Sequence, residues 1–251
     1  MNYQITGAYF SPTGGTRRAI NALCSCWEEE DVNYVELGGS NRTEQVQLGK
    51  KDLLVLALPV YADAIPEVEG MLDGLHGDGT PCVVAATYGN CKYGHALAQM
   101  KKLLGERGFR CVAGITIITP HVFAPTLGED RPDAEDMTAL KAFAAQVEEK
   151  LNAEDWAEAE LPGNPDAPFR HIKPIPKMRD WDICMGCAFC AYVCPTGAMD
   201  PKTLMWNDDK CISCMTCVSR CPNGALGYNS SVMASKLTER FSQRLPIETF
   251  L

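Results

Sequence analysis

The chain has 251 residues and a formal net charge of −9, with 46% hydrophobic and 22% charged residues. Residues 1–165 contain 13 Lys and Arg against 24 Asp and Glu, whereas residues 166–251 contain 10 against 8. The acidic N-terminal part argues against nucleic acid as a partner, and no apolar stretch approaches the roughly 18 residues of a membrane span.

Apolar runs of strand length, bounded by Gly, Pro and Asp, occur five times before residue 120. They lie at about 3–10, 32–37, 52–58, 82–87 and 111–118. Helical patterns fall between or after them, at about 16–29, 66–75, 94–107 and 132–151. This alternation predicts an α/β domain with a parallel sheet covered by helices on both faces. Ligands of such sheets bind beyond the carboxyl ends of the strands.

The loop after the first predicted strand has the composition of a phosphate site. It contains Ser11, Thr13, Gly14, Gly15 and Thr16. Backbone N–H groups and the helix dipole favour a phosphate where a strand gives way to a helix. The loop has neither the Lys of a P-loop nor the G-x-G-x-x-G pattern of a dinucleotide fold. The alternative is a Gly-rich turn with an ordinary Thr at the start of the helix.

Tyrosines follow the third and fourth predicted strands, at the same edge of the sheet. The two segments are Pro59–Pro66 and Thr87–Gly94. The loop from Ser11 to Thr16, after the first predicted strand, resembles the S/T-x-T-G-x-T phosphate loop of flavodoxins, which holds the FMN phosphate without a basic side chain. One departure is Ile20, at a position where flavodoxins usually carry a small residue.

The resemblance to flavodoxins implies a five-stranded sheet of order 2-1-3-4-5 and FMN as cofactor. It also implies that the two later loops contact the isoalloxazine ring, with Tyr61 stacking on it and Tyr88 or Tyr93 opposite. Any single Tyr has an alternative reading as a half-buried loop residue. The implied ring contacts are Pro59, Val60, Tyr61, Thr87, Tyr88, Gly89, Asn90 and Tyr93.

A long loop follows the fifth predicted strand and leaves the same edge of the sheet. It contains His121 and Phe123. We expect both to lie over the flavin, where His121 is a candidate catalytic residue that donates a proton to a reduced substrate. The alternative is a solvated loop before the next helix.

Prolines divide the chain between residues 161 and 178. A stretch so rich in Pro forms neither a helix nor a central strand, and it predicts an extended linker. We therefore expect an FMN-binding domain at 1–160, a linker at 161–178, a second domain at 179–229 and a helical tail at 230–251. In the tail, Val232, Leu237, Phe241 and Leu245 recur at roughly helical intervals.

Two cysteine runs dominate the second domain. Both read C-x2-C-x2-C-x3-C-P, the pattern that holds [4Fe-4S] clusters in bacterial ferredoxins and whose fourth Cys ligates the other cluster. The pattern assigns one cluster to Cys184, Cys187, Cys190 and Cys221, and the second to Cys211, Cys214, Cys217 and Cys194. Structural zinc has no use for the third Cys and the trailing Cys-Pro of each run. Disulfides are disfavoured because residues 1–7 lack the features of a signal peptide, so we expect a cytoplasmic protein.

The whole chain resembles flavodoxin–ferredoxin fusions, the EFR1-family ferredoxins of anaerobes, with a small α+β ferredoxin domain after the flavodoxin-like one. This resemblance implies FMN, two [4Fe-4S] clusters and electron transfer. Because the cofactors must approach one another, we expect either docked domains or a head-to-tail homodimer.

Two functions remain open. In the first, a ferredoxin-like partner reduces the clusters, the clusters reduce FMN, and the flavin reduces a small organic acceptor. In the second, the chain only carries electrons between redox proteins. Flavodoxin carriers commonly place a Gly near the flavin N5, where a peptide flip stabilises the semiquinone. Here Ala62, Asp63 and Ala64 follow Tyr61, which makes such a flip more costly and favours the enzyme.

Overall fold

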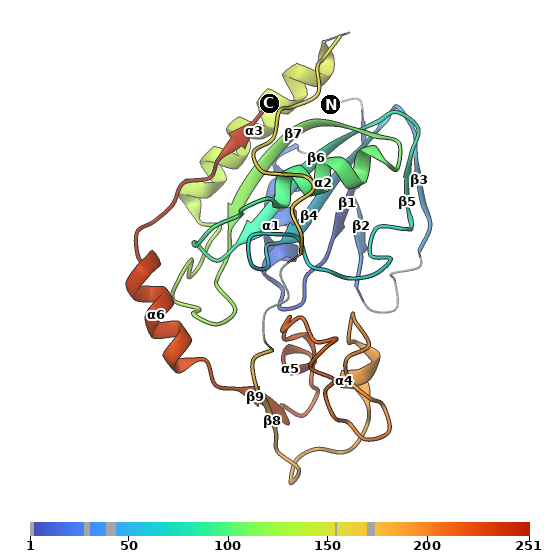
Figure 1. The fold of residues 1–251 in the computed structure, drawn as a ribbon. Coiled ribbons are helices and arrows are strands. Elements are labelled where there is room, and N and C mark those ends of the chain that lie inside the picture. The colour runs from blue at the N-terminus through green and yellow to red at the C-terminus, as the bar shows by residue number, and fades with distance from the viewer. Residues whose placement is uncertain (1–2, 28–30, 39–43, 154, 170–173) are drawn as a thin grey trace.

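The computed structural model describes residues 3–27, 31–38, 44–153, 155–169 and 174–251. Figure 1 shows a large lobe built on a sheet and a smaller lobe that contains both cysteine runs. The last strand of the chain returns to the large lobe.

Five parallel strands form the core of the large lobe. They are β1 (Gln4–Tyr9), β2 (Asn33–Glu36), β4 (Asp52–Pro59), β6 (Thr80–Tyr88) and β7 (Phe109–Ile118). Their order in space is β2-β1-β4-β6-β7, which confirms the predicted order 2-1-3-4-5. A sixth strand, β10 (Thr249–Phe250), pairs antiparallel with β7 at the edge.

Alternate residues of the central strand β4 face opposite hydrophobic cores. Leu53, Val55 and Ala57 pack in the core that also contains residues of α1 (Gly15–Cys24) and α3 (Ala134–Asn152). Leu54, Leu56 and Leu58 pack in the core that contains residues of α2 (Ala96–Gly105). Both faces of the sheet are therefore buried, which explains why its strands read as continuous apolar runs.

The prediction of a helix at 66–75 is wrong, because this segment forms successive turns. Gly70 has a positive φ of 70°, and a Cβ at Gly74 would lie 2.1 Å from the carbonyl oxygen of Glu44. The turns lead into β5 (Leu75–Gly77), which pairs with β3 (Val46–Leu48) in a small parallel sheet that was not predicted. Met71, Leu72 and Leu75 are buried, so their spacing reflects packing of the turns on the core.

The small lobe holds two short helices and one antiparallel strand pair. Strands β8 (Lys177–Arg179) and β9 (Leu226–Tyr228) pair at its base, so a strand begins inside the stretch predicted as linker. Helices α4 (Phe189–Tyr192) and α5 (Thr216–Ser219) each follow a residue in the left-handed conformation, Ala188 and Met215 respectively. The two cysteine runs thus adopt the same local backbone twice.

The small lobe docks on the large one through specific polar contacts. The Ser219 hydroxyl donates to the carbonyl oxygen of Pro12 at 2.8 Å, and the Tyr228 hydroxyl donates to that of Val122 at 2.6 Å. Arg220 forms an ion pair with Glu36. Pro12 and Val122 belong to two loops at the carboxyl edge of the sheet, so docking places the small lobe against that edge.

The C-terminal tail is only partly helical, which corrects the prediction for 230–251. Helix α6 (Ser231–Phe241) ends before Leu245, and the chain then extends to β10. Asn90 holds this turn of the chain: its amide nitrogen donates to the carbonyl oxygens of Phe241 and Gln243, both at 2.8 Å, and its amide oxygen accepts from the Leu245 N–H at 3.1 Å.

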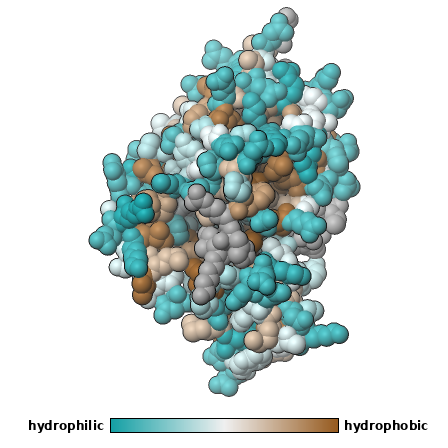
Figure 2. Space-filling view, in the orientation of Figure 1, coloured by the Kyte–Doolittle hydropathy of each residue, from teal (hydrophilic) through white to brown (hydrophobic). Residues whose placement is uncertain are grey.

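The surface in the orientation of Figure 2 is mostly hydrophilic, with apolar side chains along the side where α6 lies. Val232 and Met233 of α6 are among the exposed large hydrophobic residues. In the part of the chain that the structure describes, no helix combines the length and apolarity needed to cross a bilayer.

Candidate functional site

Each predicted set of four cysteines surrounds its own cavity in the small lobe. Cys184, Cys187, Cys190 and Cys221 line one of them, here called the outer cavity. Cys194, Cys211, Cys214 and Cys217 line the other, called the inner cavity. In both, three cysteines come from one run and the fourth from the other run. The crossed grouping is the arrangement that ferredoxin-type runs require.

Two polar groups beside these cavities suit a cluster. Arg179 lines the outer cavity, and its Nε is buried without a hydrogen-bond partner among the described residues. Trp206 lines the inner cavity, and its Nε1 likewise makes no hydrogen bond of normal length there. Burial raises the pKa of Cys217, and the nearby Trp206 opposes that effect. N–H donors beside the thiolates are the contacts that stabilise a charged cluster.

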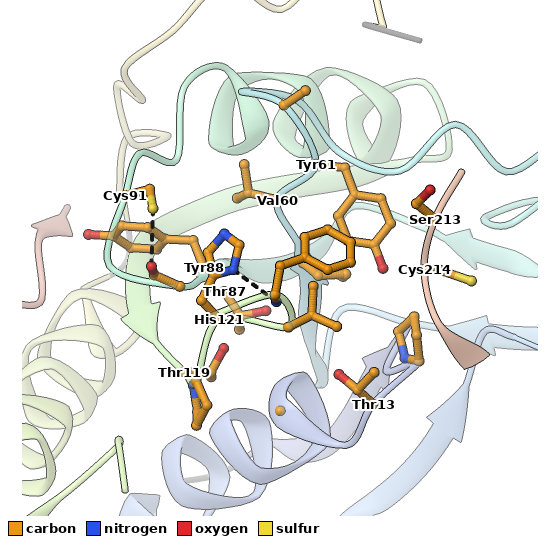
Figure 3. A pocket seen from close by; sticks show the side chains of 18 of the residues that line it. Thr13, Val60, Tyr61, Thr87, Tyr88, Cys91, Thr119, His121, Ser213 and Cys214 are labelled. Atoms are coloured by element: carbon orange, nitrogen blue, oxygen red, sulfur yellow. Dashed lines mark hydrogen bonds between the residues drawn. The ribbon is translucent and has the colours of Figure 1, made fainter. Parts of the chain in front are cut away.

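A third cavity of about 330 Å³ lies at the carboxyl edge of the large sheet, between the lobes. Figure 3 shows side chains from several loops converging on it, including Thr13, Tyr61, Thr87 and His121. This site, here called the interlobe cavity, falls within the size range of ligand pockets. The candidate residues that line it are Ser11, Thr13, Gly15, Thr16, Pro59, Val60, Tyr61, Thr87, Tyr88, Gly89 and His121.

The loop before α1 leaves part of the N-terminus of that helix available to a ligand. Gly14 precedes the helix with φ of 89°, a left-handed conformation, and as a glycine it provides no side-chain cap. The Ser11 hydroxyl accepts from the Arg17 N–H at 2.9 Å, and the Thr16 hydroxyl bonds that of Thr87 at 2.8 Å. Thr13 is exposed and lines the cavity. Free N–H groups and the helix dipole here favour an anion, as the sequence predicts.

The loop after β4 makes a tight turn beside the cavity. Tyr61 and Ala64 exchange backbone hydrogen bonds at 2.7 and 3.1 Å, with Ala62 at φ of 50° and Asp63 at φ of 72° between them. Positive φ at both central residues defines a type I′ turn, which normally uses Asn or Gly. The Asp63 carbonyl oxygen accepts from the His95 N–H at 2.6 Å. The turn is therefore fixed from outside, despite its uncommon residues.

His121 enters the interlobe cavity from the loop after β7. Its Nδ1 accepts from the Phe123 N–H at 3.1 Å, so the neutral ring carries its proton on Nε2. Burial lowers the pKa of His121, which keeps the ring neutral at pH 7. A Cβ on Gly89 would lie 2.4 Å from the Cβ of His121. Only glycine at position 89 leaves room for this histidine.

Three predicted FMN contacts lie outside the lining of the cavity: Gly14, Asn90 and Tyr93. Asn90 binds the tail instead, as described above. The Tyr93 hydroxyl donates to Glu248 at 2.9 Å, while its ring packs edge-on against Tyr88 at 5.8 Å. Both side chains thus hold the C-terminal tail in place, and Tyr93 also packs behind the cavity-lining Tyr88.

Phe123, which the sequence analysis expected beside His121, also lines the cavity. Further lining residues belong to the same loops as predicted contacts: Pro12, Ala62, Asp63, Cys91, Lys92, Thr119, Pro120 and Val122. The residues from distant segments were not predicted as ligand contacts; they are Ile175, Ile212, Ser213, Cys214, Met233, Leu237 and Phe241. For these, the helical spacing of Leu237 and Phe241 in the tail was the one signal in the sequence. The contributions of the small lobe follow from docking, which no local pattern records.

Cys214 lies in the walls of two cavities. It lines the inner cavity with three other cysteines, and it also lines the interlobe cavity beside Ser213 and opposite Tyr61 (Figure 3). Burial, and to a smaller extent the Cys214 thiol, raises the pKa of Tyr61. Ile212 also lines both cavities, so these two residues separate a cysteine-lined site from the pocket at the sheet edge.

Residues 178–200 and 204–227 match the family described as 4Fe-4S binding domain. No curated protein matches the chain significantly. Among solved structures, flavodoxin 2 of Bacillus cereus is 20% identical with a TM-score of 0.44, covering 59% of this chain and 99% of that one. Flavodoxin 1 of the same organism is 18% identical, with a TM-score of 0.41 and coverages of 58% and 97%. Megasphaera elsdenii flavodoxin is 17% identical, with a TM-score of 0.37 and coverages of 57% and 99%.

The strand order of the large lobe is that of the flavodoxin-type doubly wound sheet, read from this chain alone. The small lobe contains both segments of the family match. The chain therefore joins a sheet with the flavodoxin-type strand order to a small lobe that matches the 4Fe-4S binding domain family.

Proposed function

We propose that the protein is an iron–sulfur flavoprotein that couples one-electron transfer through two [4Fe-4S] clusters to FMN. The observation that carries this proposal is the position of Cys214, which lines both the inner cavity and the interlobe cavity. Each cluster exchanges single electrons, whereas FMN supplies hydride or stepwise electron transfer. Contact between the two sites suits a protein that couples one-electron transfer by the clusters to two-electron transfer by FMN.

The residues fit these groups. Cys184, Cys187, Cys190 and Cys221 would hold the outer cluster, and Cys194, Cys211, Cys214 and Cys217 the inner one. The loop from Ser11 to Thr16 would bind the FMN phosphate through the open N-terminus of α1. Tyr61 and Tyr88 line the rest of the interlobe cavity and would contact the ring.

The favoured activity is reduction of a small organic acceptor, with a ferredoxin-like protein as electron donor. His121 supports this choice, because its Nε2 proton is available at the cavity while Nδ1 is held by the Phe123 N–H. A neutral imidazole in that position can hold or donate a proton to a substrate. With an identified acceptor, His121→Ala should lower turnover, and unchanged turnover would remove His121 from the catalytic residues.

An anaerobic reductive titration of the reconstituted protein tests the proposal as a whole. We expect about eight irons and about one FMN per chain, with electrons from the clusters reaching the flavin. Visible and EPR spectra, together with quantified iron and released flavin, provide the measurement. A protein that binds eight irons but no flavin would refute the assignment of the interlobe cavity and leave the small lobe as a ferredoxin.

A second candidate, the dedicated electron carrier, is favoured by the limited volume of the interlobe cavity. Ile212 of the small lobe and Met233, Leu237 and Phe241 of α6 or its end complete the lining. A cavity of about 330 Å³ offers FMN little additional space for an acceptor. Under this alternative the partners are redox proteins alone.

The two one-electron midpoints of the bound flavin distinguish the two functions, and Ala62→Gly tests whether the turn after β4 sets them. Flipping the central peptide of a type I′ turn gives type II′, whose first central position requires glycine. Relief of that strain at Ala62 should move the two one-electron midpoints of the bound flavin relative to each other by about 1 kcal/mol, or about fivefold in the equilibrium. Spectroelectrochemistry measures both midpoints, with Ala64→Gly as control because Ala64 lies outside the two left-handed positions.

An enzyme requires midpoints in the wild type that favour two-electron transfer, and the shift on Ala62→Gly should be absent from the control. Widely separated midpoints that already favour one-electron transfer in the wild type would support the carrier. Equal shifts in both variants would show that the turn is not the element that sets them.

A further inference from the structure

Strand β8 runs past both cysteine-lined cavities and presents one cation to each. Lys177 Nζ donates to Cys211 Sγ at 3.1 Å and to the carbonyl oxygen of Ile175 at 3.2 Å. Arg179 Nη1 donates to Cys184 Sγ at 3.2 Å. The two residues are two apart in a strand, so their side chains leave the same face. Met178 between them leaves the other face and is 57% exposed.

Each cavity has one of these cations in its lining, and Arg179 additionally contacts Met199 and Trp206 of the inner cavity. Among the described residues that line the inner cavity, Lys177 is the charged one, and among those that line the outer cavity it is Arg179. No described Asp or Glu lines either cavity. Each set of four thiolates therefore has one positive partner inside the protein.

Arg179 is held more firmly than Lys177. Its guanidinium lies over the rings of Trp181 and Trp206, with centroids 5.1 and 5.3 Å away, and Nη2 donates to the carbonyl oxygen of Leu204 at 2.9 Å. Lys177 has two acceptors at one ammonium group, a thiol and a carbonyl. A planar guanidinium stacked in this way is pre-organised, whereas an ammonium is a point charge on a flexible stem.

We infer that strand β8 sets the reduction potentials of the two clusters separately, through Lys177 for the inner cluster and Arg179 for the outer one. Reduction adds one electron and thus one negative charge to a cluster. A cation in contact with a ligating sulfur stabilises the reduced form more than the oxidised form and raises the potential. The effect decreases with distance, so each cation acts mainly on the cluster that it touches.

The inference rests on the clusters of the proposed function but not on FMN. It goes beyond the proposed function by naming β8 as the element that sets the reduction potential of each cluster separately. Because the inner cluster adjoins the interlobe cavity through Cys214, the relative potentials bias the direction of electron flow. One strand of three residues then controls that bias.

The test compares Lys177→Gln, Arg179→Gln and the control Met178→Gln in the full, anaerobically reconstituted chain. Redox titration followed by EPR should yield two one-electron midpoints. Lys177→Gln should lower one of them, with about a tenfold smaller ratio of reduced to oxidised cluster at fixed potential, or about 59 mV for a one-electron couple. Arg179→Gln should lower the other by a similar amount, and Met178→Gln should move neither.

Charge-conserving variants check the cause. Lys177→Arg should restore most of the first shift, while Arg179→Lys should restore only part of the second, because an ammonium cannot make the stacked and forked contacts. If the wild-type midpoints coincide, each glutamine variant should split them.

Iron content separates the possible failures. A wild-type chain that does not bind about eight irons refutes the proposed function. Full iron in the variants with unmoved midpoints, or with both midpoints moved equally by each variant, overturns the inference alone. If a glutamine variant loses iron, the charge-conserving variant at the same position replaces it. Lys177→Arg must then leave the midpoint of the inner cluster nearly unchanged, and Arg179→Lys must lower that of the outer cluster.

Discussion

Replacing Cys214 with alanine is expected to reduce the iron content from about eight to about four atoms per chain and to stop electron transfer from the clusters to the flavin. Cys214 is one of four cysteines around the inner cavity and also part of the wall of the interlobe cavity. Loss of the inner cluster therefore removes the redox group next to the flavin. The outer set, Cys184, Cys187, Cys190 and Cys221, remains complete.

The measurement is stopped-flow reduction by a reduced two-cluster ferredoxin, a donor too large to enter the interlobe cavity. Flavin reduction by this donor should disappear, while direct reduction by dithionite should persist. Cys91→Ala is the matched control, because Cys91 lines the interlobe cavity but neither cysteine-lined cavity. Retained flavin and the EPR signal of the outer cluster would show that both lobes are folded. A normal rate with only four irons would contradict the proposed path through the inner cluster.

Thr13→Glu is expected to weaken FMN binding by at least about a hundredfold. Thr13 is exposed on the loop before α1 and lines the interlobe cavity, so a longer side chain there needs no rearrangement of the core. Two like charges about 4 Å apart repel by about 4 kcal/mol at an effective dielectric of about 20, and each 1.4 kcal/mol is tenfold. A hundredfold loss allows for screening by solvent at this position.

Riboflavin provides the internal comparison, since it has the ring but no phosphate. Its dissociation constant should change much less than that of FMN when both are measured by flavin fluorescence with the cluster-loaded protein. Thr13→Gln adds a similar volume without the charge and should retain most of the FMN affinity. An equal loss of both ligands in Thr13→Glu would mean that this loop does not bind the phosphate.

Local sequence patterns predicted the structure correctly wherever one short segment determines its own backbone geometry. The repeated spacing of the cysteine runs places three thiols on one tight loop, and both runs do adopt the same turn and short helix. The five apolar runs became the five parallel strands, and the four runs other than the edge strand β2 are buried on both faces. The open helix start after Gly14 follows equally from a glycine that accepts a positive φ.

The spacing of apolar residues gave a wrong prediction where packing between distant segments outweighed the local preference for a helix. The apolar spacing at 66–75 matched a helix, but the backbone approaches Glu44 so closely at Gly74 that turns replace it. Asn90 was placed at the flavin from its loop, yet its three hydrogen bonds go to a segment about 150 residues later in the chain. Its donors and acceptor match backbone groups that only the folded tail brings near.

The sequence by itself determined the cofactor chemistry of the small lobe, the order of alternating elements and the loop suited to a phosphate, since each depends on residues close together in the chain. The tertiary structure alone decided which distant segments complete the lining of the interlobe cavity, which residues of the two lobes meet at Cys214, and which cation of β8 faces which cysteines. These features arise from docking of surfaces distant in sequence. Such contacts depend on the complementary shapes of whole lobes, and no periodicity or spacing within one segment encodes them.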